Sequence, residues 1–176
     1  MRLVRSAASE AEFRNLAGEV ARAWQAQAPS RLVVGLEGPL GAGKTTWVRG
    51  MLEGLGHRDR VPSPTYTLLE HFDLGGLTVV HLDLYRLSED GGAGGEAAGA
   101  FEALGVRDWI ARPDTWLLVE WPGRAPQLVA RCDVWIAFEF LDTEARSVTL
   151  TSRSGAGGAA LRGLRSSSSF DSSFGA

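Results

Sequence analysis

The stretch from Gly38 to Thr45 constrains the fold of this chain more than any other. It reads GPLGAGKT and matches the pattern G-x-x-x-x-G-K-[ST] at every fixed position. Residues 31–37 before it form an apolar run, and residues 46–55 after it have helical spacing. Glycines allow a tight turn whose N–H groups point inward, and the following helix adds its positive dipole end. This predicts a strand, a phosphate-binding loop and a helix in a three-layer α/β fold of the P-loop NTPase type, with a mostly parallel central sheet.

The chain has 18 Lys and Arg residues in total. Lys44 is the only lysine among them, and all the others are arginines. The chain therefore uses arginine wherever a generic cation is sufficient, and keeps lysine where a compact charge on a flexible stem is required. In a phosphate-binding loop, such a lysine reaches the β- and γ-phosphates, while the hydroxyl of Thr45 can ligate Mg²⁺. A glycine-rich turn without a ligand is the alternative interpretation.

Periodicity predicts the remaining elements. The sequence S-x-x-E at Ser9 is a capping box that opens an amphipathic helix. Two alternating runs around residues 73–76 predict an antiparallel hairpin that extends the sheet. Four apolar residues in a row before Glu120 suit a strand buried on both faces. The expected elements are a helix at 9–26, strands at 31–37, 65–72, 77–84, 115–120, 133–140 and 145–151, a helix at 44–55, and short helices near 101–105 and 106–110.

The chain is expected to hold one domain over residues 1–151. Residues 88–100 are rich in glycine and predict a flexible insert, and residues 152–176 are rich in Ser, Gly and Ala and predict a mostly disordered tail. Two prolines hold residues 61–68 extended. That segment carries Thr65 and lies where nucleotide hydrolases place switch-type loops; an ordinary connector is the alternative.

Composition excludes several classes of protein. A net charge of −3 and a pI near 5.6 argue against a protein that binds RNA or DNA by itself, because such binding requires a basic surface. A single cysteine, Cys132, forms no intramolecular disulfide and is expected to be a buried small hydrophobe. No signal-peptide pattern and no run of 18 apolar residues is present, so we expect a soluble cytoplasmic protein without a membrane segment.

Two carboxylates follow apolar strands, Asp83 after residues 78–82 and Glu120 after residues 116–119. Strand carboxyl ends face the ligand crevice of a parallel α/β sheet, so both acids can meet the phosphate loop there and hold Mg²⁺ or orient the attacking water. A helix cap or a surface acid is the alternative for each. Three arginines could supply a cation to the transition state, and the sequence does not choose among them: Arg49, Arg86 and Arg124. The three histidines are far apart in sequence and are expected to be surface or strand residues: His57, His71 and His81.

Four motifs together resemble the TsaE family, bacterial ATPases of threonylcarbamoyladenosine biosynthesis on tRNA. They are GPLGAGKTT at 38–46, SPTYT at 63–67, HLDLYRL at 81–87 and VEWP at 119–122. The phosphate loop alone is common to many proteins, whereas the combination is far more specific. The resemblance extends from about residue 9 to about residue 150.

The resemblance implies an ATP- and Mg²⁺-binding protein that hydrolyses ATP slowly alone and acts with the TsaD and TsaB subunits. These modify adenosine 37 of tRNAs reading ANN codons, and tRNA would be met only through them. The resemblance also implies that Lys44, Asp83 and Glu120 are catalytic, and that Thr45, Glu120 and Asp83 form the metal site. It implies a nucleotide site made of Leu40, Gly41, Ala42, Gly43, Lys44, Thr45, Thr46, Thr65 and Trp121.

The chain departs from the family pattern at Pro39, which replaces the usual acid and removes one N–H at the start of the loop. The insert at 91–99 and the serine-rich tail are further departures. The alternative function is a small P-loop kinase that phosphorylates a metabolite, although the chain has no arginine between Arg86 and Arg107 to build the usual lid. A GTP-binding switch is disfavoured because the chain lacks an N-K-x-D motif.

Overall fold

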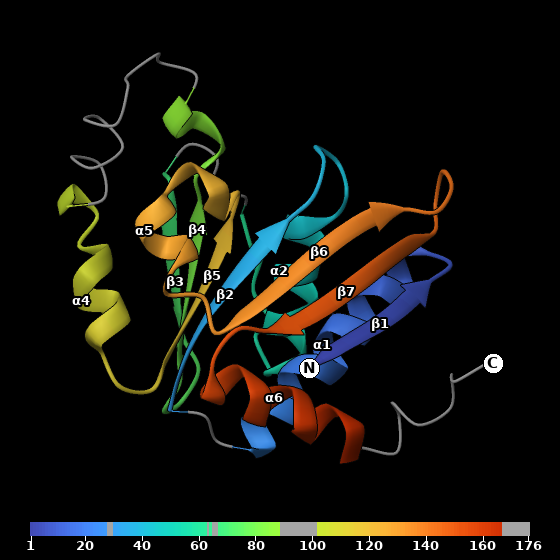
Figure 1. Ribbon diagram of the computed structural model, residues 1–176, viewed down its shortest axis with the longest axis horizontal. Helices are drawn as coiled ribbons and strands as arrows, with labels where there is room; N and C mark the ends of the chain where they lie inside the picture. Colours follow the sequence, from blue (N-terminus) through green and yellow to red (C-terminus); the bar gives the residue numbers. More distant parts are fainter. Residues whose placement is uncertain (28–29, 63, 65–66, 89–101, 167–176) are drawn as a thin grey trace.

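The computed structural model describes residues 1–27, 30–62, 64, 67–88 and 102–166. Helices cover both faces of one seven-stranded sheet (Figure 1). The strands are β1 (Arg2–Ala7), β2 (Arg31–Glu37), β3 (Leu69–Asp73), β4 (Thr78–Asp83), β5 (Thr115–Glu120), β6 (Val134–Phe140) and β7 (Arg146–Ser152). The helices are α1 (Glu10–Ala26), α2 (Lys44–Gly54), α4 (Val106–Ala111), α5 (Pro126–Val129) and α6 (Gly155–Ser166), with short 3₁₀ turns η1 (Tyr85–Ser88) and η2 (Pro122–Arg124).

The sheet has the strand order β1-β7-β6-β2-β5-β4-β3. The four strands β6, β2, β5 and β4 run parallel, and antiparallel strands flank them on both sides. The predicted mostly parallel α/β sheet and the β3–β4 hairpin are thus confirmed. The phosphate-loop strand β2 pairs with β5, and β5 pairs with β4, so the carboxyl ends of these three strands lie at one edge of the sheet.

Helix α1 begins where its capping box predicts. The Ser9 hydroxyl accepts a hydrogen bond from the Glu12 amide, and the Glu12 carboxylate accepts one from the Ala8 amide. Helix α1 packs closely on α2 at Gly18 and Gly54. The two backbones come so near that a side chain at Gly54 would collide with the backbone of Gly18. This close crossing lies at the end of α2, and at its start the Phe13 ring of α1 lies against Gly43 of the phosphate loop.

Two hydrophobic cores lie on opposite faces of the sheet. On one face, Phe13, Trp24 and Trp47 from α1 and α2 pack against alternate strand residues. On the other face, Val106 and Leu128 from α4 and α5 cover the remaining strand residues. Burial on both faces explains the uniformly apolar sequences of β2 and β5, whose residues are almost all buried.

The prediction of a disordered tail from residue 152 is wrong for residues 155–166, which form α6. Ala160, Leu161 and Leu164 are at most 1% exposed and join the core that α1 covers. A side chain at Gly157 would come within 1.9 Å of the Asp133 carbonyl oxygen, so its glycine permits close packing. Two of the glycines that suggested disorder, Gly157 and Gly163, are here contact residues. Residues 167–176 lie outside the described residues.

Strand β1 was not predicted. It pairs with β7 at the edge of the sheet, and only Leu3 and Ala7 are buried, so its apolar pattern is weak. In the described part of the chain, none of the helices has the length and apolar character needed to cross a membrane.

Candidate active site

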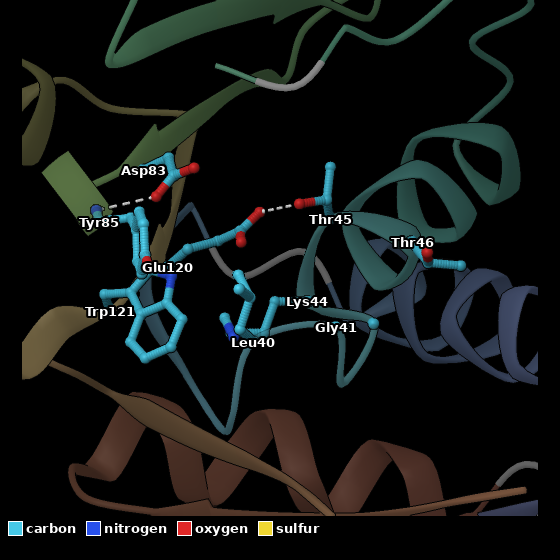
Figure 2. Close-up of a pocket in the computed structure, with 10 residues that line it drawn as sticks. Leu40, Gly41, Lys44, Thr45, Thr46, Asp83, Tyr85, Glu120 and Trp121 are labelled. Carbon is cyan, nitrogen blue, oxygen red and sulfur yellow. Dashed lines mark hydrogen bonds between the residues drawn. The ribbon is translucent and has the colours of Figure 1, made fainter. Parts of the chain in front are cut away.

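A cavity of about 320 Å³ opens at the carboxyl ends of β2, β4 and β5 (Figure 2). The phosphate loop forms one wall, and the ends of β4 and β5 form the other. Ten of the described residues line it: Leu40, Gly41, Gly43, Lys44, Thr45, Thr46, Asp83, Tyr85, Glu120 and Trp121.

The phosphate loop depends on two left-handed glycines. Gly41 has φ 78° and Gly43 has φ 98°, values that strain a residue with a side chain. A side chain at Gly43 would also come within 3.0 Å of the Phe13 ring on α1. Helix α2 begins directly after it, with the Trp47 amide donating to the Gly43 carbonyl. The amides at this helix start have no partner within the helix, and such amides are chemically suited to an anion.

Lys44 is held inside the loop and is only 4% exposed. Its Nζ donates to the carbonyl oxygens of Gly38 at 2.8 Å and Pro39 at 2.9 Å, and it lies 3.8 Å from the centre of the Trp121 ring. Burial lowers the pKa of Lys44 below its ordinary value, and the nearby carboxylates Glu120, Glu37 and Asp83 oppose that shift. One cation thus faces three carboxylates.

The two strand-end acids lie side by side. Asp83 and Glu120 occupy paired positions of β4 and β5, and they are 4% and 3% exposed. Glu120 Oε1 accepts hydrogen bonds from Thr45 Oγ1 at 2.7 Å and from the ring of His81 at 2.8 Å. Asp83 Oδ1 accepts from the Tyr85 amide at 2.9 Å. Figure 2 shows Glu120 reaching across the cavity to Thr45.

The chemistry of this donor set fits Mg²⁺. The hydroxyl of Thr45 and the carboxylates of Glu120 and Asp83 are hard oxygen ligands, which this cation prefers. No group of three or more His, Cys, Asp or Glu side chains that could hold a metal is found among the described residues. Mg²⁺ sites commonly use only one or two carboxylates and complete their coordination with water and substrate phosphates. The excess of carboxylates beside Lys44 also favours a divalent cation when a polyphosphate enters.

Comparison with known proteins identifies the relatives of this chain. The model of the family described as threonylcarbamoyl adenosine biosynthesis protein TsaE matches residues 7–148. The chain belongs to the TsaE family. A TsaE protein of Haemophilus influenzae is 36% identical over 126 residues, covering 72% of this chain and 73% of the relative. One of Aquifex aeolicus is 30% identical, covering 81% and 90% of the two chains.

A solved structure supports the fold of this TsaE family member. YdiB of Bacillus subtilis superposes with a TM-score of 0.69 over 92% of this chain and 93% of that chain. The two sequences are 22% identical, so this likeness concerns the fold alone. The family expected from the four motifs is therefore confirmed by the sequence comparisons.

The structure brings most of the predicted site residues of this TsaE protein together. Lys44, Thr45, Asp83 and Glu120 converge on one cavity. Of the remaining predicted nucleotide-binding residues, Ala42 belongs to the loop, but its side chain is fully buried and does not line the cavity. Thr65 lies outside the described residues, as does the insert at 91–99. Those that line the cavity are Leu40, Gly41, Gly43, Thr46 and Trp121. The roles of all these residues remain predictions.

The sequence interpretation missed two groups at the site. His81 was expected to be an ordinary strand or surface histidine, yet it is fully buried against Glu120. The signal was present, because residues two apart on a strand share a face and Asp83 follows His81 by two. Tyr85 was missed as well. It lines the cavity, and the centre of its ring lies 5.2 Å from the centre of the Trp121 ring.

Among the three candidate arginines, Arg124 lies beside the site. Its guanidinium lies 5.1 Å from the Tyr85 ring and 5.6 Å from the Trp121 ring. Arg49 donates to the Val61 carbonyl and lines a separate cavity. Arg86 lies on η1, which follows the Asp83 end of β4, and it stays an open candidate.

Proposed function

We propose that this TsaE family member binds and hydrolyses ATP with Mg²⁺ as an accessory subunit of the complex that makes N6-threonylcarbamoyladenosine at position 37 of tRNAs reading ANN codons. The observation that carries the proposal is the convergence of Lys44, Thr45, Asp83 and Glu120 on one cavity beside a glycine loop. The names of the curated relatives, tRNA threonylcarbamoyladenosine biosynthesis proteins, support the pathway.

The phosphate loop would bind the triphosphate. Lys44 already donates to two carbonyl oxygens, Gly38 and Pro39, and phosphate oxygens would take their place. The amides at the start of α2 would hold the remaining phosphate oxygens. Trp121 lies against Lys44 and would cover the phosphates from the side of β5. Excluding water in this way strengthens the attraction between the ammonium group and the phosphates, because the local dielectric constant is lower.

The acids would serve the hydrolysis step. Mg²⁺, when bound, would neutralise charge that develops on the phosphate oxygens. Thr45 can ligate the cation through an oxygen lone pair while its O–H group continues to donate to Glu120 Oε1, since a hydroxyl both accepts and donates. The second oxygen of Glu120 and the carboxylate of Asp83 would orient the attacking water or the water ligands of the cation.

We propose that the partners are the TsaD and TsaB subunits and that tRNA is reached through them. The net charge of −3 supports this, because a protein that binds tRNA by itself uses a basic surface. A slow intrinsic hydrolysis rate is expected, since Arg124 contacts the rings of Tyr85 and Trp121 and is not among the described residues that line the cavity.

The test is an ATPase assay of the full chain with Mg²⁺, with and without purified TsaD and TsaB. We expect Mg²⁺-dependent release of phosphate that rises when the partners are added. Absence of turnover under both conditions contradicts the proposal. Transfer of the γ-phosphate to a small acceptor, without stimulation by TsaD and TsaB, would instead identify the alternative, a metabolite kinase.

A further inference from the structure

A buried histidine contacts the acid at the end of β5. His81 is fully buried on β4, and its Nε2 lies 2.8 Å from Glu120 Oε1. Its other nitrogen, Nδ1, is buried without a hydrogen-bond partner in the described part of the chain. Burying an unpaired ring nitrogen costs free energy, so this imidazole is not explained by packing alone.

The contact defines the direction of the hydrogen bond. The carboxylate oxygen also accepts from Thr45, so the ring proton is assigned to Nε2, which donates to Glu120. Nδ1 then carries a lone pair, which is less costly to leave unpaired than an N–H group. Two donors thus converge on Oε1 of Glu120, and none from the described residues is recorded on Oε2. That second oxygen remains available on a side chain that lines the cavity.

The two donors lie on different elements. Thr45 is the second residue of α2, directly after the glycine loop. His81 lies on β4, which pairs with β5 over its whole length, and His81 is opposite Leu118, two residues before Glu120. A donor on the neighbouring strand of the same sheet holds its acceptor in a fixed register. His81 therefore fixes the position of the Glu120 carboxylate relative to the sheet.

We propose that His81 is a positioning residue that holds Glu120 through Oε1 and so directs Oε2 toward the reacting phosphate and its metal. This rests on the proposed ATPase function. Groups that orient a metal-binding side chain typically change affinity or activity by about 10- to 100-fold when removed. We expect His81→Leu to lower kcat by about 10- to 100-fold with Mg²⁺ and both partners present. The Kd for ATP measured without Mg²⁺ should change less than about threefold, because the phosphate loop is intact.

The experiment compares His81→Leu, His81→Gln and a matched control, His57→Leu. Glutamine keeps an N–H donor and is expected to recover much of kcat. His57 also has a buried ring nitrogen without a partner, but it packs on Phe72 and has no recorded contact with Glu120, so its variant should keep the wild-type kcat. In a Glu120→Gln background, replacing His81 by leucine should lower kcat little further.

The same pair of substitutions is measured by chemical denaturation, which needs no activity. A non-additive change in unfolding free energy supports the contact between His81 and Glu120 even if the wild-type protein fails to hydrolyse ATP. Such a failure would reject the proposed function separately. The positioning role is overturned if His81→Leu keeps the wild-type kcat, or if its effects add fully to those of Glu120→Gln in both measurements.

Discussion

The phosphate-loop edge and the C-terminal helix α6 are both rich in glycine, but they use it differently. In the loop, Gly41 and Gly43 adopt left-handed backbone angles that let amides converge on an anion. In α6, Gly157 lies in regular helix and brings its backbone against Asp133. The comparison teaches that the chemical use of a glycine is visible when a motif surrounds it, whereas its use in close packing depends on a distant neighbour.

The attachment of α6 illustrates that dependence. Asp133, at the start of β6, accepts from the Val33 amide through one carboxylate oxygen and from the Ser154 hydroxyl through the other. The Ser154 oxygen in turn accepts from the Gly157 amide. Residues far apart in sequence therefore join β2 to the first turn of α6. The local signal before this helix is Ser154 alone, without the S-x-x-E pattern that opens α1.

The largest expected effect is on ATP affinity and follows from a substitution in the phosphate loop. Lys44→Ala should weaken ATP binding by at least about 100-fold, because a buried charge that holds phosphate oxygens is lost. Isothermal titration calorimetry with ATP measures it. Arg49→Ala is the control, since this cation lies on the same helix but lines another cavity. Unchanged affinity of the Lys44 variant would remove the loop from the nucleotide site.

The next effect concerns the acid edge of the same cavity. Glu120→Gln should cut hydrolysis by about 100-fold while ATP affinity stays within a few-fold, because the amide lacks the charge that serves the metal or water. Single-turnover hydrolysis with Mg²⁺ measures this change. Glu139→Gln, an exposed carboxylate on β6, is the control. Full turnover by the Glu120 variant would show that this carboxylate has no part in the reaction.

A third experiment tests the packing glycine of α6. In an isolated helix, alanine in place of glycine is stabilising by about 1 kcal/mol. In this fold Gly157→Ala should destabilise the protein by about 1–3 kcal/mol, because the new methyl group meets the Asp133 carbonyl. Urea denaturation compares it with Gly155→Ala, where nothing lies within 4 Å. If both variants gain stability, α6 does not dock as described. ATP affinity should be unchanged in both.

The smallest expected effect concerns the first turn of α6. Ser154→Ala removes the oxygen that accepts from the Gly157 amide and the hydroxyl that donates to Asp133. A lost helix cap costs about 1 kcal/mol, so the urea midpoint should fall slightly. Hydrogen exchange should report faster exchange in α6 and unchanged protection in α2. Equal loosening of both helices would show that the two regions are more tightly coupled than their separate contacts suggest.

Much of the fold was predictable because the signals were local. The Ser9 capping box predicted the start of α1. The apolar runs of β2 and β5 predicted buried parallel strands, and the hairpin turn predicted the β3–β4 pair. Edge strand β1 was missed because its partner β7 is contributed by residues 139 to 149 positions away, and its own sequence has only two buried residues.

The sequence by itself determined which side chains to expect at the site, because the loop pattern and the strand-end acids Asp83 and Glu120 are short-range features with few alternative uses. Only the tertiary structure decided that His81 contacts Glu120, and that α6 folds at all. The physical reason is the same in both cases. A hydrogen bond between neighbouring strands and a helix docked through Leu161 and Gly157 are free-energy gains that exist only after distant segments have come together.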